Sequence, residues 1–314
     1  MSKSSEDKLE RIPVINVVVR FLKKVKLPGL EGLSLYQLLE LYIVGIAEGA
    51  LTSRASAIAF SFFTALFPFL LFILILIPYI PVEGFKEEFL VFLESSLPPN
   101  TSDFFMKNIF ENIEGTKRTG LISSVFLLSV FLMANGVSAV FSGFEYSYHT
   151  QYTRNVFKQF LFATGVALIL AFLMIITVIV LGWFEIYVID NAIDVLEKKG
   201  YEIKYKADFW VRMAKYVFFV IMIYMATAIL YYFGTKEGRH SKFFSVGALF
   251  TTLLILLNSY LFGLYIENFS QYNELYGSIG ALLILLFYLW LNSNILLLGF
   301  ELNAAMHQLR RKHS

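Results

Sequence analysis

Six long, uncharged and strongly apolar stretches dominate the hydrophobic pattern of the chain. They cover residues 55–82, 119–144, 159–184, 216–235, 243–266 and 275–300. A hydrocarbon core about 30 Å thick needs roughly 20 helical residues, at about 1.5 Å rise each. Every stretch is long enough to span it. The pattern therefore predicts an all-α, polytopic membrane protein with six transmembrane helices.

Strands and a soluble core do not explain these stretches. A transmembrane strand needs about 10 residues of alternating polarity, and residues 70–77 show no alternation. A buried helix of a soluble protein would account for one such stretch, but not for six in a chain of 57% hydrophobic composition. In lipid, backbone N–H and C=O groups must find partners within their own segment, which selects the α-helix.

The distribution of Lys and Arg predicts that both termini are cytoplasmic. The segments that would then lie inside hold 16 basic residues, and those outside hold 10. The short turns are the clearest case, because residues 236–242 carry three basic residues whereas residues 267–274 carry only acidic charges. Cytoplasmic loops are enriched in Lys and Arg. We therefore expect an N-in/C-in topology.

The hydrophilic segments are expected to follow the membrane surface. Residues 11–26 interleave apolar and basic side chains, a pattern typical of an amphipathic helix on an anionic leaflet. Ser34 can cap a second helix. Packing of both helices on the bundle is the equally weighted alternative. The predicted organisation is a cytoplasmic segment with interfacial helices (1–54), a membrane domain (55–308) with an outer amphipathic insertion (83–118), and a basic cytoplasmic tail (309–314).

No charged residue lies deep in a predicted span, so amides are the informative polar groups there. We expect each to face a neighbouring helix or a wet cavity, because an amide facing lipid is costly. The plainer alternative is an interhelical hydrogen bond worth about 1 kcal/mol. The four candidate pathway or packing residues are Asn135, Asn258, Asn292 and Asn294.

Pro68 lies in the middle of the first predicted span. Proline cannot donate a helical hydrogen bond, and its ring crowds the preceding turn. We therefore expect a bend or local opening of this helix, with the freed carbonyl near residue 64 met by a neighbour or by water. Thr64 is well placed to help.

Arg54 and Glu301 flank the first and last spans directly. In a six-span topology they reach the same inner depth, where they can pair and form an inner-face polar cluster with Asn303. An Arg–carboxylate contact gains two parallel hydrogen bonds, but it must offset the desolvation of both charges. The alternative, in which each side chain snorkels separately into the headgroups, is slightly favoured.

The sequence contains few of the residue patterns that enzymes use. The chain has no cysteine and a net charge of +2, which leaves no thiolate chemistry and no signature of nucleic-acid binding. Nucleotide-binding and hydrolase motifs are absent. The histidines are scattered without metal-ligand spacing, at positions His149, His240, His307 and His313. We expect a protein that is not an enzyme and needs no cofactor or metal.

Two motifs resemble those of a known family. The segments Ala55-Ser-Ala-Ile-Ala-Phe-Ser-Phe-Phe-Thr-Ala-Leu-Phe-Pro-Phe-Leu-Leu, Tyr276-Gly-Ser-Ile-Gly-Ala-Leu and Leu298-Gly-Phe-Glu-Leu-Asn-Ala resemble the opening and closing motifs of the YihY/BrkB family of bacterial inner-membrane proteins. The resemblance covers roughly residues 40–308. The family is associated with virulence and envelope lipid export, and was once misassigned as a ribonuclease. The scattered histidines disfavour that nuclease.

The resemblance implies a multi-pass inner-membrane protein whose partners include membrane lipids. Its first implied function is translocation or export of an amphipathic envelope lipid or a similar substrate. A non-transporting scaffold that docks an envelope-assembly protein is the alternative, and a membrane enzyme acting on lipid headgroups is a weaker third. A lateral groove lined by the asparagines would favour the first, a solid bundle the second, and clustered ionisable groups the third. The oligomeric state stays open.

Overall fold

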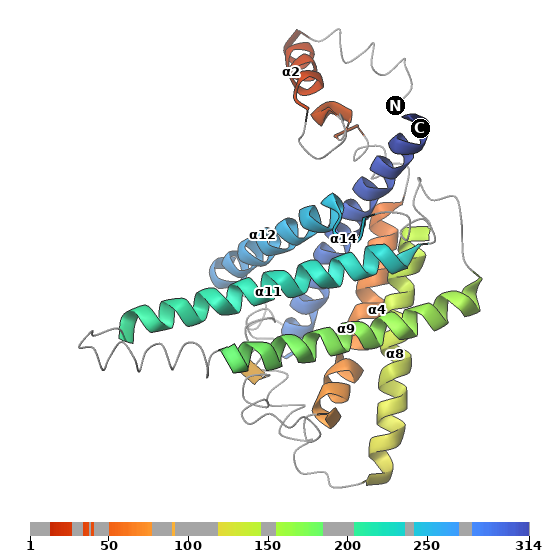
Figure 1. The fold of residues 1–314 in the computed structure, drawn as a ribbon, viewed down its shortest axis with the longest axis vertical. Helices are drawn as coiled ribbons and strands as arrows, with labels where there is room; N and C mark the ends of the chain where they lie inside the picture. Colours follow the sequence, from red (N-terminus) through yellow and green to blue (C-terminus); the bar gives the residue numbers. More distant parts are fainter. Residues whose placement is uncertain are drawn as a thin grey trace.

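The computed structural model describes residues 13–26, 34–37, 39–40, 50–76, 90–91, 119–145, 155–184, 204–235, 242–269 and 278–313. In this part of the chain every named element is a helix (Figure 1). They are α2 (Pro13–Lys24), α4 (Leu51–Leu76), α8 (Thr119–Glu145), α9 (Val156–Phe184), α11 (Lys204–Gly234), α12 (Val246–Phe269) and α14 (Ser278–His313). The six helices after α2 are long and apolar enough to cross a membrane. The prediction of an all-α, six-span protein is confirmed.

Two of these helices extend well beyond the apolar stretches that predicted them. α11 already begins at Lys204, and α14 continues to His313, through most of the predicted basic tail. Hydropathy marks only the part of a helix that lipid requires to be apolar, whereas backbone hydrogen bonding continues into polar flanks. The outer insertion, 83–118, lies outside the described residues apart from Leu90 and Val91, which are helical.

The six spanning helices close into a ring. Around it they follow the order of the chain, α4, α8, α9, α11, α12 and α14, and α14 packs back against α4. α8 also contacts α11 and α14 across the ring. Figure 1 shows α9 and α11 crossing α4 and α8, whereas α12 lies beside α11 and α14. The first and last spans are therefore neighbours, which decides how their flanking charges can meet.

An aromatic cluster joins three helices near the end of α8. The rings of Phe144 and Phe300 stack with centroids 4.1 Å apart, and Tyr231 approaches both edge-on. Phe144 is fully buried. α11 can approach because Gly234 has no side chain, since a Cβ there would lie 2.5 Å from the Phe144 ring. Close packing of this kind holds spanning helices together in lipid, where no hydrophobic drive acts between helices.

Candidate functional site

Arg54 and Glu301 form a buried ion pair that also reaches a third helix. Nη2 of Arg54 donates to Oε1 of Glu301 at 3.0 Å, and Nη1 donates to the carbonyl of Gly143 at 2.8 Å. Only 8% of the Arg54 side chain and 2% of the Glu301 side chain are exposed. The ion pair, which the sequence placed slightly below separate placement of the two side chains in the headgroups, is therefore formed.

The end of α8 explains why the arginine reaches that carbonyl. α8 stops at Glu145, so the carbonyl of Gly143 has no partner within the helix and lies at the negative end of the helix dipole. Gly143 also lets α4 and α8 approach closely, because a Cβ there would lie 2.8 Å from Cδ1 of Ile58. The guanidinium therefore caps one helix while it neutralises a carboxylate on another.

Asn303 has different partners from those expected. Its Nδ2 donates to Oγ of Ser245, and its Oδ1 accepts the backbone N–H of Gly247, both at 2.8 Å. These groups belong to the start of α12, where N–H groups lack intrahelical partners. Two positions along a helix correspond to about 200° of rotation. Asn303 therefore faces away from Glu301 and caps α12, and the predicted three-residue cluster is reduced to the ion pair.

Tyr231 is a second polar link, which the sequence did not reveal. Its hydroxyl donates to the carbonyl of Leu296 at 2.7 Å and is hydrogen-bonded to the hydroxyl of Thr251 at 2.6 Å. Thr251 is fully buried. The link joins α11, α12 and α14. Tyrosines near span ends usually mark the membrane interface, so nothing in the sequence separates this buried hydroxyl from an interfacial one.

Gln159 plays a comparable part between α8 and α9. Its Nε2 donates to Oγ of Ser142 at 2.8 Å and to the carbonyl of Ser138 at 3.2 Å. The side chain is buried. A glutamine at the start of a predicted span was a visible signal, but its partners depend on how the two helices pack.

The asparagines of the last two spans bond to each other and to the backbone of their own helix. Nδ2 of Asn258 donates to Oδ1 of Asn292 at 3.3 Å, across the α12–α14 contact. Asn292 and Asn294 each donate to the carbonyl four residues earlier in α14. The plainer alternative, an interhelical hydrogen bond, therefore holds for the first pair. Asn135 is exposed on α8, so it does not pack against a neighbouring helix of this chain, and the expectation that it faces a wet cavity stays a prediction.

Pro68 does not interrupt the first span. α4 is helical from Leu51 to Leu76 on both sides of it. Any opening is therefore confined to the hydrogen bond that proline cannot donate. The hydroxyl of Thr64 donates to the carbonyl of Ser61. The bend itself stays a prediction.

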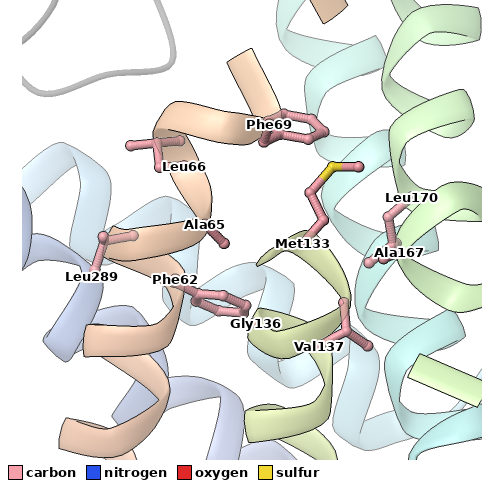
Figure 2. Close-up of a pocket in the computed structure, with 10 residues that line it drawn as sticks. All are labelled: Phe62, Ala65, Leu66, Phe69, Met133, Gly136, Val137, Ala167, Leu170 and Leu289. Atoms are coloured by element: carbon pink, nitrogen blue, oxygen red, sulfur yellow. The ribbon is translucent and has the colours of Figure 1, made fainter. Parts of the chain in front are cut away.

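An apolar pocket lies where α4, α8, α9 and α14 meet (Figure 2). Its volume is about 240 Å³. Figure 2 shows Met133 and Phe69 at its rim, on α8 and α4. Gly136 brings α8 close to α4 beside it, since a Cβ there would lie 3.2 Å from the Cβ of Ala65. The lining contains no charged or amide side chain and consists of Phe62, Ala65, Leu66, Phe69, Met133, Gly136, Val137, Ala167, Leu170 and Leu289.

Comparison with known proteins matches the part of the chain that holds the six spans. The family model described as Virulence factor BrkB covers residues 43–314, which include Arg54 and Glu301. The chain belongs to this family. It is thus an integral membrane protein of the BrkB type, and the resemblance of its two end motifs is confirmed. No solved structure matches it.

Two curated relatives of this BrkB-family protein cover most of its length. The ribonuclease-like protein YfkH of Bacillus subtilis is 24% identical over 82% of this chain and 91% of its own. The UPF0761 membrane protein NT05HA_1801 of Aggregatibacter aphrophilus is 23% identical over 84% and 89%. Among the described residues no three His, Asp or Glu side chains gather as a metal site would require. This arrangement of the described residues gives no support to the nuclease activity that the name of the first relative suggests.

Proposed function

We propose that this protein translocates or exports an amphipathic envelope lipid across the bacterial inner membrane, and that the apolar pocket holds part of an acyl chain. The pocket carries the proposal. Sites for drug-sized ligands typically measure about 300–1,000 Å³ and include a few polar groups. A pocket of about 240 Å³ with an apolar lining suits a segment of hydrocarbon chain and not a headgroup.

The position of the pocket supports access from the bilayer. It adjoins α4 on the side of Leu66 and Phe69, next to Pro68, where the helix lacks one hydrogen bond. Neighbouring helices that meet only through apolar side chains can part without breaking hydrogen bonds. The ion pair joins α4, α8 and α14 at Arg54, Gly143 and Glu301, whereas the pocket lies further along the same helices, at residues 62–69 of α4, 133–137 of α8 and 289 of α14. The helices can therefore stay joined at one end while the apolar junction beside the pocket admits a chain.

The asparagines, which would have favoured lipid translocation by lining a groove, do not support this proposal. Asn258 and Asn292 are bonded to each other, and none of the four lines the pocket. The protein is proposed to act without chemical catalysis and without a cofactor, with both termini in the cytoplasm as the basic residues indicate. A gradient or a partner protein would then supply the direction of transport.

A lipid-scrambling assay tests the proposal. The purified protein in liposomes should expose an inner-leaflet fluorescent phospholipid to an external quencher, and Leu170→Trp should slow this roughly tenfold, about 1.4 kcal/mol in the barrier, because the indole occupies the pocket. Ile169→Trp is the matched control, since Ile169 lies on the same helix but is 45% exposed. Thermal unfolding of both variants shows whether they fold.

Two results would contradict the proposal. Wild-type protein that does not scramble, yet crosslinks to an envelope-assembly protein in cells, would favour the scaffold. Equal slowing by both tryptophan variants would show that the pocket has no special part in transport.

A further inference from the structure

Helix α2 is described at its side chains from residue 19 onward, where buried and exposed apolar residues occur side by side. Val19 is buried, with 7% of its surface exposed, whereas Phe21 is 65% exposed. Packing on the bundle and binding to the membrane surface, the two alternatives that the sequence left open, both stay predictions for this helix. The exposed Phe21 ring is available for contact with another surface.

Backbone and side-chain contacts hold α2 against the segment that follows it. The N–H of Leu35 donates to the carbonyl of Val25 at 2.9 Å. Ser34 and Gln37 form a reciprocal cap, since the N–H of Ser34 donates to Oε1 of Gln37 and the N–H of Gln37 donates to Oγ of Ser34. The ammonium of Lys23 lies 5.0 Å from the centre of the Tyr36 ring. These contacts fix which face of α2 stays exposed.

The exposed face combines the aromatic ring with positive charge. Arg20 and Lys24 are four residues apart and share a helix face beside Phe21, and Lys26 follows directly; all three are exposed. Residues 13–26 contain no acidic residue. An apolar side chain rimmed by cations is typical of helices that lie in the interface of an anionic membrane. Figure 1 places α2 at the end of the molecule where α14 ends.

We propose that α2 binds the anionic phospholipid surface beside the bundle. Phe21 enters the boundary between headgroups and acyl chains, and Arg20, Lys24 and Lys26 contact the lipid phosphates. This interaction does not depend on the proposed lipid translocation. Because this face is positively charged, its proposed partner is a bilayer rich in the anionic lipid phosphatidylglycerol.

The absence of cysteine from the chain allows a direct test on the full-length protein. Phe21→Cys, labelled with an environment-sensitive dye, is placed in nanodiscs of phosphatidylglycerol or of phosphatidylcholine. The emission should shift to the blue in phosphatidylglycerol and remain close to that of a water-exposed dye in phosphatidylcholine. The shift should fall as salt rises, because salt screens charges near the surface.

Charge variants in the same labelled background decide the role of the basic residues. Replacing Arg20, Lys24 and Lys26 together by Gln should abolish most of the shift. Lys242→Gln, at an exposed lysine beside α12, is the matched control and should leave it unchanged. A dye in water in both lipids would overturn the proposal. So would an equal shift in both lipids, which would indicate apolar insertion or protein packing without recognition of charge.

Discussion

Arg54 and Glu301 are separated by 247 positions in the sequence, yet Nη2 of the arginine lies 3.0 Å from Oε1 of the glutamate. The pair joins the first and last spanning helices, and the carbonyl of Gly143 adds α8 to the same contact. A buried pair of this kind contributes little net stability relative to apolar residues, but losing one partner leaves an uncompensated charge in a region of low dielectric.

Neutralising one member of this pair should destabilise the protein strongly. Glu301→Met or Arg54→Met is expected to cost about 3 kcal/mol, measured by thermal unfolding in detergent. The double variant Arg54→Met/Glu301→Met should lose less than the sum of the single variants, by at least about 1 kcal/mol. Strictly additive losses would show that the two charges do not act on each other.

Two glycines offer a matched test of close packing. A Cβ at Gly299 would collide with the hydroxyl of Thr251, whereas one at Gly263 would meet nothing within 4 Å. Gly299→Ala should therefore cost about 2 kcal/mol or more through overpacking, and Gly263→Ala should gain up to about 1 kcal/mol in helix propensity. Similar unfolding temperatures for the two variants would contradict the close α12–α14 contact.

The hydroxyl of Tyr231 should matter more than that of another tyrosine in the spans. Tyr231→Phe removes the bonds to Leu296 and Thr251 and leaves a buried carbonyl with one partner fewer, so we expect a loss of about 1–2 kcal/mol. Tyr260→Phe is the control, because Tyr260 is 66% exposed. Chemical unfolding of the two variants in the same detergent compares them. An equal loss in Tyr231→Phe and Tyr260→Phe would show that the polar link does not contribute to stability.

Asn135 should tolerate an apolar replacement. Its side chain is exposed on the spanning helix α8, and we expect an exposed side chain there to face lipid. Asn135→Leu is expected to raise stability by about 1 kcal/mol, because an amide in an apolar environment without a partner is costly. The measurement is thermal unfolding together with the molecular mass in detergent. Lower stability with a change in oligomeric state would instead indicate that Asn135 contacts a second chain.

Interactions within each stretch of the chain are sufficient to determine where the helices form. A span needs about 20 apolar residues whatever its neighbours are, and each helix satisfies its own backbone. Residues 119–144, for instance, became α8 (Thr119–Glu145) almost without change. The helix ends were less predictable. α11 and α14 run past the apolar windows because polar flanks remain helical where hydropathy no longer marks them.

The sequence by itself determined the class, the six spans and the family, because hydropathy and short motifs are properties of consecutive residues. Only the tertiary structure decided the partners. Glu301 and Asn303 are two residues apart, yet one binds Arg54 on α4 and the other caps α12. Which helices become neighbours, and which face each turns to the other, follows from packing around the whole ring. The buried pair, the Tyr231 link and the apolar pocket all depend on that arrangement.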